Sequence, residues 1–548
     1  MPSYSAIPDV HVDSVDLWTH LLGSENTKDE NKHLFVDVDD ESRFLSRRTV
    51  RQKSKAFGNA LRTTWNWQKG DVLAIFGPND IDWPTILFGT LWAGGCLSPI
   101  SFTFTAQELA FQLKNSSTKA IVTHPAGLKT AQEAARLVGL PQSRILLFGP
   151  KDLGSKLNCK YYSELESIGP VPRRYTFEPK KDTALLVYSS GTTGLPKGVS
   201  LSHWNLVAQC IQLTLTEVEA ATAGYETKLL AFLPFAHIYS IMEGVIRILA
   251  TGTQVIVMPK FDFQRALAAI QKFRITYIYV APPILLALAR SPLVDQYDIS
   301  SIGGIMSAAA PLATQLIEDV YTKFKIPVKQ AYGMSEASPA VTHQMDWEKA
   351  MIYKGSVGTL LPNMSAKWVD LDGNEVAKGQ EGELWIKGPN VFAHYHENPQ
   401  ATENSFSDDG WYKTGDVGYE DEHGNYYITD RVKELIKYKG YQVAPAELEA
   451  MLLKNPKVKD VAVLGMYVEE MASEVPRAFI VPTEGNKPSD QLAKEIVAWL
   501  DAQVSYPKKL RGGVQFVEEV PKSPTGKILR RLLKDKYGTK ISAAKSKL

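Results

Sequence analysis

The segment Ser189–Gly198 carries residue types that bind phosphate, in the order Ser-Ser-Gly-Thr-Thr-Gly-Leu-Pro-Lys-Gly. Its glycines let the backbone approach an anion closely, its hydroxyl and backbone N–H groups can donate to phosphate oxygens, and its lysine adds positive charge. No register of the segment fits the Gly-x-x-x-x-Gly-Lys-Ser/Thr spacing of a Walker loop. A flexible surface turn is the alternative, but a predicted strand at Thr183–Tyr188 and the density of hydroxyls favour phosphate binding.

Five later segments contain aromatic, histidine, carboxylate or lysine residues that could take part in the same chemistry. They are Phe235–Tyr239, Gln330–Glu336, Tyr412–Asp416, Asp430–Gln442 and Pro521–Lys527. Together with Ser189–Gly198, in this order and spacing, they resemble the signature segments of the adenylate-forming superfamily. That superfamily contains acyl-CoA synthetases, 4-coumarate–CoA ligases, beetle luciferases and the adenylation domains of peptide synthetases. The resemblance extends from about residue 40 to 535 and implies an AMP-forming acid–thiol ligase that uses ATP, Mg²⁺ and CoA.

The resemblance implies a role for each polar residue in forming an acyl-adenylate. Lys527 would bridge the acid's carboxylate and the α-phosphate of ATP, where the reaction needs charge neutralisation and alignment. Glu336 would bind Mg²⁺, a hard ion that prefers carboxylate oxygen. Asp416, an acceptor-only group, would bind both ribose hydroxyls; outside this context either carboxylate would be an ordinary surface residue. The other residues assigned to ATP or AMP are Ser189, Ser190, Gly191, Thr192, Thr193, Gly194, Lys197, Ala309, Gln330, Ala331, Tyr332, Gly333, Ser335, Arg431, Lys437 and Gln442.

For the second step, acyl transfer to CoA, the resemblance implies that the C-terminal domain rotates about Lys433. The rotation would withdraw Lys527 and bring Lys437 to the adenylate, with Lys439 and Gly440 bordering the pantetheine tunnel. Lys260 matches a CoA-contacting position of 4-coumarate–CoA ligases, and a solvated loop lysine is an equal alternative. A hinge of a few residues that absorbs a large dihedral change is physically ordinary.

The acid pocket is the least specified part of the sequence. The resemblance assigns it His237, Tyr239, Met242, Ala308, Ala331 and Pro339. His237 is assigned a catalytic gating role, and a satisfied core histidine is the alternative. Plant ligases carry Asn at the position of Met242 and Gly at those of Ala308 and Ala331, and each added methylene-sized group changes discrimination by only about 1–3 kcal/mol. An apolar pocket is therefore expected, for a medium- or long-chain fatty acid or an aryl-alkanoic or cinnamic acid.

The elements that must position these residues alternate between strands and helices. Strands are predicted at Thr183–Tyr188, Leu229–Leu233, Gln254–Met258, Thr276–Val280 and Pro327–Ala331, with helices at Phe263–Phe273 and Leu312–Phe324. This alternation predicts an α/β fold with a mainly parallel, helix-covered sheet. Turn signals between 355 and 430 predict an appended β-rich subdomain.

A compact α+β unit is expected at the C-terminal end. Pro445 begins a predicted helix, strands are predicted at Asp460–Met466 and Arg477–Val481, and an amphipathic helix is predicted around Leu492–Val504. We therefore expect an ATP- and acid-binding domain over 1–430, a hinge over 431–433 and a mobile cap over 434–548.

Composition limits the partners of the chain. Lys plus Arg number 61 and Asp plus Glu 60, so a net charge of +1 argues against a nucleic-acid binder. The three cysteines, Cys96, Cys159 and Cys210, cannot make a disulfide framework. The uncharged stretch after Trp83 contains glycines and a proline, which predicts a buried helix and a loop rather than integral membrane association.

The tripeptide Ser546-Lys547-Leu548 matches the peroxisomal address. It predicts the peroxisomal import receptor as a partner and the peroxisomal matrix as the location, with a solvated lysine-rich tail as the alternative. Alternative functions on the same signature segments are a luciferase-type oxygenase, a loader of carrier proteins and a catalytically dead binding protein.

Overall fold

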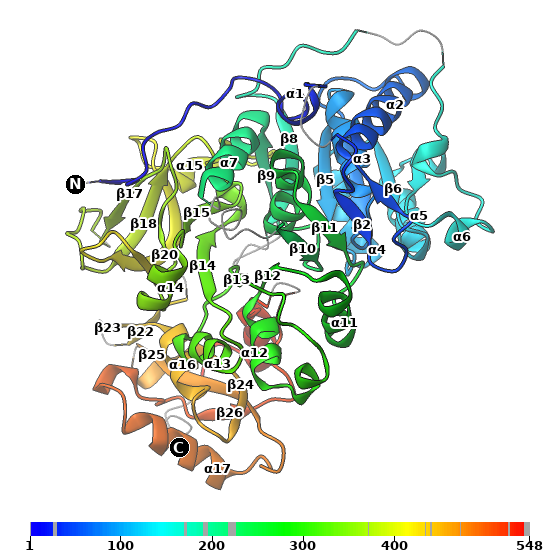
Figure 1. Ribbon diagram of the computed structural model, residues 1–548. Coiled ribbons are helices and arrows are strands. Elements are labelled where there is room, and N and C mark those ends of the chain that lie inside the picture. Colours follow the sequence, from blue (N-terminus) through cyan, green and yellow to red (C-terminus); the bar gives the residue numbers. More distant parts are fainter. Residues whose placement is uncertain are drawn as a thin grey trace.

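A computed structural model describes the chain apart from residues 1, 26–29, 169–172, 190–195, 217–225, 371, 433, 439–440, 472, 524–525 and 542–548, and apart from the side chains of residues 441, 442 and 470 (Figure 1). The described residues form a large N-terminal lobe built on three sheets and a small C-terminal lobe with a sheet of its own. The predicted fold class, α/β with a β-rich subdomain and a small α+β domain, is confirmed.

The first sheet of the large lobe has seven strands, and its centre is parallel. In spatial order they are β19 (His394–Tyr395), β9 (Lys197–Ser202), β8 (Thr183–Ser189), β5 (Cys96–Ile100), β4 (Val72–Phe76), β6 (Ala120–Thr123) and β7 (Ile145–Leu147). The central β4 and β5 are buried along their whole length, as expected for strands that helices cover on both faces.

The second sheet has nine strands and contains most of the strands that the alternation predicts. In spatial order they are β16 (Thr359–Leu360), β15 (Ala340–His343), β14 (Val328–Gly333), β13 (Gly304–Ser307), β12 (Tyr277–Val280), β10 (Lys228–Ala231), β11 (Gln254–Val257), β2 (Phe35–Asp37) and β3 (Phe44–Leu45). The predicted strand at Thr183–Tyr188 is confirmed as β8, although it lies in the first sheet. Strand β13 was not predicted, because it begins at a glycine and has only four residues.

Helices cover these two sheets and account for the apolar stretch after Trp83. That stretch is α3, in which every residue is buried, so the predicted helix is confirmed. The predicted helices α11 and α13 are also confirmed. The helices of the large lobe are α1 (Leu17–Leu22), α2 (Arg47–Trp65), α3 (Trp83–Trp92), α4 (Ala106–Asn115), α5 (Leu128–Val138), α6 (Lys151–Gly154), α7 (His203–Thr216), α9 (Ile238–Ile241), a π-helix (Met242–Ile246), α10 (Arg247–Thr251), α11 (Phe263–Phe273), α12 (Pro282–Arg290), α13 (Thr314–Phe324), α14 (Trp347–Ile352) and α15 (Pro399–Ser405). No helix in the described part of the chain is long and apolar enough to cross a membrane.

The third sheet of the large lobe is antiparallel and forms the predicted β-rich subdomain. Its strands are β1 (Ser3–Tyr4), β17 (Ser365–Val369), β18 (Gly382–Lys387), β20 (Tyr412–Glu420) and β21 (Tyr426–Arg431). In the register of β20 and β21, Asp416 lies opposite Arg431. This pairing brings two residues from separate sequence segments to adjacent positions.

The C-terminal lobe, orange to red in Figure 1, lies next to α12, where Gly526 of the lobe is close to Pro283. Its elements are β22 (Ile436–Tyr438), β23 (Tyr441–Val443), α16 (Pro445–Leu452), β24 (Val458–Val468), β25 (Ser473–Pro482), α17 (Asp490–Asp501), β26 (Val514–Phe516) and α18 (Arg530–Tyr537). Its own hydrophobic core includes Leu448, Val463 and Phe479. Helix α17 ends at Asp501, so Val504 follows the helix rather than belonging to it.

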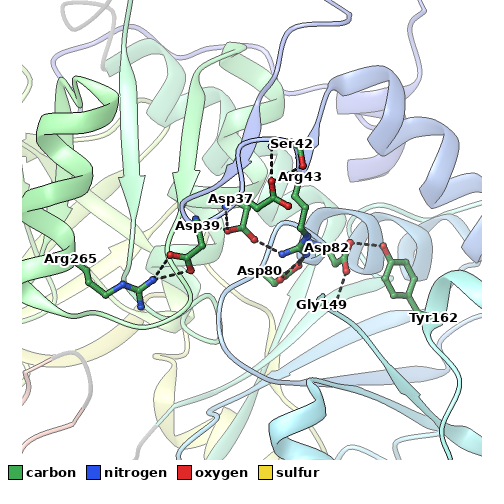
Figure 2. A network of polar contacts seen from close by, with 10 residues as sticks. Asp37, Asp39, Ser42, Arg43, Asp80, Asp82, Gly149, Tyr162 and Arg265 are labelled. Atoms are coloured by element: carbon green, nitrogen blue, oxygen red, sulfur yellow. Dashed lines mark hydrogen bonds and ion pairs between the residues drawn. The ribbon is translucent and has the colours of Figure 1, made fainter. Parts of the chain in front are cut away.

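A polar network joins the first two sheets (Figure 2). Arg43 pairs with Asp37, at the end of β2, and donates to both oxygens of Asp80, which follows β4, at 3.2 and 3.1 Å. Asp82 accepts from the Tyr162 hydroxyl at 2.9 Å. Burial, and then the neighbouring Asp82 carboxylate, raise the pKa of Asp80 to about 7.

Candidate active site

A cavity of about 1310 Å³ lies between the two lobes. Most of the predicted site residues that the structure describes line it. They are Ser189, Lys197, His237, Tyr239, Ala308, Ala309, Ala331, Tyr332, Gly333, Ser335, Glu336, Pro339, Asp416, Arg431 and Lys527. The fold therefore brings segments separated by more than 300 residues to one space.

Other predicted site residues lie elsewhere or outside the described part of the chain. Gln330, Met242, Lys260 and Lys437 do not line the cavity. Gln330 is buried beside it, where its side-chain nitrogen donates to the Ser356 carbonyl at 3.0 Å. Ser190, Gly191, Thr192, Thr193, Gly194, Lys433, Lys439, Gly440, the side chain of Gln442 and the tripeptide Ser546-Lys547-Leu548 lie outside the described residues.

Asp416 is held by a donor on each of its carboxylate oxygens. The Tyr332 hydroxyl donates to Oδ2 at 2.5 Å, and Arg431 Nε lies 3.0 Å from Oδ1. Burial, and then the Asp416 carboxylate, raise the pKa of Tyr332 well above its ordinary value, so the phenol remains a donor. An ionised carboxylate has about four lone-pair sites. Asp416 is thus fixed in position and retains the capacity to accept hydroxyl donors from the cavity.

Glu336 lies on a short turn after β14 and is also buried. Its Oε1 accepts from the Tyr395 hydroxyl at 2.8 Å, and Lys197 Nζ lies 4.7 Å from the centre of the Tyr395 ring. Among the described residues, no three His, Cys, Asp or Glu side chains gather into a metal site. The donor set fits Mg²⁺, which proteins commonly hold through one or two carboxylates together with phosphate oxygens and waters.

Lys527 enters the cavity from the C-terminal lobe. Its backbone N–H donates to Ser523 Oγ at 3.1 Å, and its carbonyl accepts from the Ser523 N–H at 2.8 Å. Gly526 has a φ of +82°, and a Cβ there would lie 2.9 Å from Pro283 of α12. Burial, and then the Arg431 guanidinium, lower the pKa of Lys527 to about 8.

Lys437 has a different environment from Lys527. It is exposed on β22, and its backbone N–H donates to Glu474 Oε2 at 2.8 Å within the C-terminal lobe. Lys260 is likewise exposed, on the loop after β11. In this arrangement only one of the two predicted catalytic lysines, Lys527, reaches the cavity.

His237 precedes α9 in the part of the cavity predicted to bind the acid. Burial lowers the pKa of His237, so its ring is neutral at physiological pH, and its Nε2 has no hydrogen-bond partner among the described residues. Ala309, also in the cavity wall, has a φ of +73°, a strained value for a residue with a Cβ.

The structure corrects the expected position of Met242. Met242 is fully buried in the hydrophobic core, as is Ile241, and the neighbouring Glu243 lines the cavity instead. A π-helix over residues 242–246 explains the difference. Its turn is wider than that of an α-helix, so Glu243, the fourth residue after Tyr239, faces the cavity in place of Met242, the third. Arg247 Nη1 donates to Glu243 Oε2, and the spacing of four residues was a sequence signal for this ion pair.

Comparisons with known proteins match nearly the whole chain. The family model for the AMP-binding enzyme matches residues 24–396, and that for the AMP-binding enzyme C-terminal domain matches residues 447–527. The probable 4-coumarate–CoA ligase 1 of Dictyostelium discoideum is 38% identical over 487 residues, which is 86% of each chain. The 4-coumarate–CoA ligase 1 of Solanum tuberosum is 35% identical over 543 residues, covering 98% of this chain and 97% of the relative. The crystal structure of ATP-bound MatB from Rhodopseudomonas palustris superposes with a TM-score of 0.81 at 26% identity, covering 95% of this chain and 99% of that one.

Proposed function

This chain belongs to the family of AMP-binding enzymes, and we propose that it joins an aryl or cinnamic acid to CoA at the expense of ATP. In the first step the acid's carboxylate oxygen forms a bond to the α-phosphorus while the bond to pyrophosphate breaks. In the second step the CoA thiolate attacks the acyl carbonyl and AMP leaves. The observation that carries this proposal is the convergence of Lys527, Asp416 and Glu336 on one cavity that also contains the acid-pocket residues.

The residues have separate tasks in adenylate formation. The Lys527 ammonium neutralises charge between the carboxylate and the α-phosphate, where preorganised charge is most effective. Asp416, oriented by Tyr332 and Arg431, holds the ribose hydroxyls. Glu336 would hold Mg²⁺, which would neutralise the phosphates of ATP. His237, neutral and half-buried, lines the cavity in the part predicted to bind the acid.

For thioester formation we propose that the C-terminal lobe rotates about Lys433. Lys437 is exposed on this lobe while Lys527 occupies the cavity, so exchange of the two lysines requires the lobe to move as a body. Its separate hydrophobic core supports such motion. Lys439 and Gly440 would then border the CoA channel, with Lys260 near it.

The choice of an aryl acid over a fatty acid is supported by two observations. The curated relatives at 35–38% identity are 4-coumarate–CoA ligases. In this chain Tyr239 and Tyr279, which meet edge to face at 5.8 Å between ring centres, line the cavity together with Met306. Aromatic walls favour a planar ring, because ring pairs add about 0.5–1.5 kcal/mol beyond their area burial.

The test of this function is AMP release from ATP in the presence of CoA, Mg²⁺ and single acids from a panel. The panel contains cinnamic, aryl-alkanoic and fatty acids. We expect CoA-dependent AMP release with at least one aryl acid. Release with fatty acids alone would refute the aryl assignment, and no release with any acid would refute the ligase assignment.

We also propose that the import receptor reads Ser546-Lys547-Leu548 and that the enzyme acts in the peroxisomal matrix. The support is the match of the tripeptide to the peroxisomal address. A fluorescent fusion ending in this tripeptide should colocalise with a peroxisomal marker, and a fusion that lacks it should not. The same distribution for both fusions would refute the location.

A further inference from the structure

A buried asparagine joins the first two sheets beside the segment that is predicted to bind the acid. Asn79 follows β4 of the first sheet and is 3% exposed. Its side-chain Nδ2 donates to the Leu233 carbonyl at 2.9 Å, and its Oδ1 accepts from the Phe235 N–H at 2.8 Å. Both backbone groups belong to the segment that follows β10 of the second sheet. One side-chain amide therefore bonds the backbone on both sides of Pro234.

The bonded segment leads directly into the cavity. Residues 236–239 line the cavity, whereas Asn79 does not. The His237 N–H donates to the Pro234 carbonyl at 3.0 Å, so the turn that carries His237 begins at the residue between the two bonds to Asn79. This turn lies between β10 and α9 and belongs to neither element. Because no ladder of sheet or helix hydrogen bonds holds the turn, its position depends on bonds to other segments.

Asn79 is itself held from several sides. Its backbone N–H donates to the Pro259 carbonyl at 3.2 Å, on the loop that follows β11. The rings of Trp83 and Phe235 meet edge to face at 5.8 Å between centres. The next residue, Asp80, is bonded within the polar network that Figure 2 shows. The amide therefore bonds the cavity segment from a residue whose own backbone is fixed.

The two buried backbone groups need a donor and an acceptor. The carboxamide of Asn79 supplies both from one side chain. An ionised carboxylate has no donor for the Leu233 carbonyl, and a methyl group has neither a donor nor an acceptor. A buried backbone N–H or C=O without a partner is costly, so loss of the amide favours a shift of the segment toward water or another partner.

We propose that Asn79 is a positioning residue for the acid, because its amide fixes the segment that carries His237 and Tyr239 into the cavity. It acts through that segment rather than on the substrate. The predicted nucleotide and metal residues Asp416 and Glu336 lie on β20 and on the turn after β14, so their positions do not depend on this amide. This role rests on the proposed acid–CoA ligase function and adds a residue that lies outside the six signature segments.

The test measures AMP release at saturating CoA while either the acid or ATP is varied. The acids are cinnamate, 3-phenylpropanoate and octanoate, and the acid with the highest kcat/KM for the unmodified enzyme is used throughout. Asn79→Ala and Asn79→Asp should raise KM for the acid about tenfold or more and leave KM for ATP within about twofold. A loss of folded enzyme alone would lower kcat and change neither KM. An unchanged KM for the acid, or an equal rise of both KM values, would therefore overturn the role of Asn79.

Asn363→Asp is the matched control. The Asn363 Nδ2 donates to the Val10 carbonyl at 3.1 Å, and its Oδ1 accepts from the Val10 N–H at 3.2 Å, so this amide makes the same kind of two-bond contact outside the cavity. The control should leave both KM values within about twofold of the original, since it perturbs no cavity segment. A rise of KM for the acid in Asn363→Asp equal to that in Asn79→Asp would count against a specific effect.

Backbone hydrogen exchange gives a readout that does not require turnover. In the unmodified enzyme the Phe235 N–H should exchange at least about tenfold more slowly than exposed amides, because it is buried and bonded to Asn79. Asn79→Ala should remove this protection and leave that of Ile75, on β4, unchanged. Fast exchange of Phe235 in the unmodified enzyme, which needs no folded variant, or full protection in Asn79→Ala would overturn the positioning role. No AMP release by the unmodified enzyme with any acid would instead be a failure of the ligase function.

Discussion

Lys527 offers a direct test of the adenylation geometry, because the structure gives both the direction of its pKa shift and its position in the cavity. Burial and the Arg431 guanidinium lower its pKa to about 8, so the ammonium is present below that pH and is lost above it. Only the cation can neutralise charge between the carboxylate and the α-phosphate. The kcat/KM for adenylate formation should therefore fall above pH 8, by about tenfold per pH unit, because this parameter reports the free enzyme.

Two substitutions distinguish the effect of the positive charge at position 527 from the effect of its loss at alkaline pH. Lys527→Ala should lower the rate of adenylate formation about 100- to 1000-fold, the usual loss for one preorganised donor. Lys527→Arg should retain part of the activity and lose the alkaline decline, because a guanidinium stays charged throughout the accessible range.

The assay is pyrophosphate release without CoA between pH 6.5 and 9.5, beside thioester formation from supplied acyl-AMP and CoA. Lys527→Ala should leave the second reaction within a few-fold of the original, because Lys527 acts only in the first step. An alkaline decline of unchanged midpoint in Lys527→Arg would refute the assignment of the titration. Equal loss of both half-reactions in Lys527→Ala would refute the separation of the two steps.

Three other substitutions test the lobe arrangement and the sheet network. Lys437→Ala should slow thioester formation from acyl-AMP at least tenfold and spare pyrophosphate release, since Lys437 is exposed away from the cavity while Lys527 lines it; the reverse pattern would contradict its role. Gly526→Ala should reduce pyrophosphate release several-fold more than thioester formation, because the added Cβ would clash with Pro283 while the lobes are in this arrangement. Equal effects on the two reactions would argue against contact between the lobes at Gly526. Asp80→Asn should flatten the pH dependence of stability measured by urea unfolding. Because the folded-state pKa of Asp80 is about 7 and its ordinary value 3.8, the folded protein binds a proton that the unfolded chain releases, so stability falls as the pH rises from about 4 to 7. The control is Asp39→Asn, at the exposed end of the same network, and an unchanged slope in Asp80→Asn would contradict the shift (Figure 2).

Local patterns were sufficient to predict many elements of the fold. Helix α11 begins and ends at the predicted residues, Phe263 and Phe273, and β11 agrees with its predicted strand to one residue. Such elements are encoded by neighbouring residues, through side-chain periodicity and caps. The sheet to which a strand belongs depends on distant partners, and this is why β8 was placed with strands of the other sheet.

The residue types of the nucleotide site could also be predicted from the sequence, because each nucleotide-binding segment combines a glycine with a characteristic lysine or carboxylate. The sequence alone determined which residues are chemically suited to bind phosphate, ribose and metal. It did not reveal that Tyr332 and Arg431 occupy the two oxygens of Asp416, since that depends on the pairing of β20 with β21 and on the approach of β14.

Only the tertiary structure decided which groups meet in the cavity. A single wider turn buries Met242 and presents Glu243, although both follow Tyr239 at helical spacing. The docking of the C-terminal lobe brings Lys527 to the cavity and leaves Lys437 exposed, although both lysines belong to that lobe. A residue's type sets the chemistry that it can perform, whereas its direction and its neighbours follow from packing between segments that are far apart in the chain.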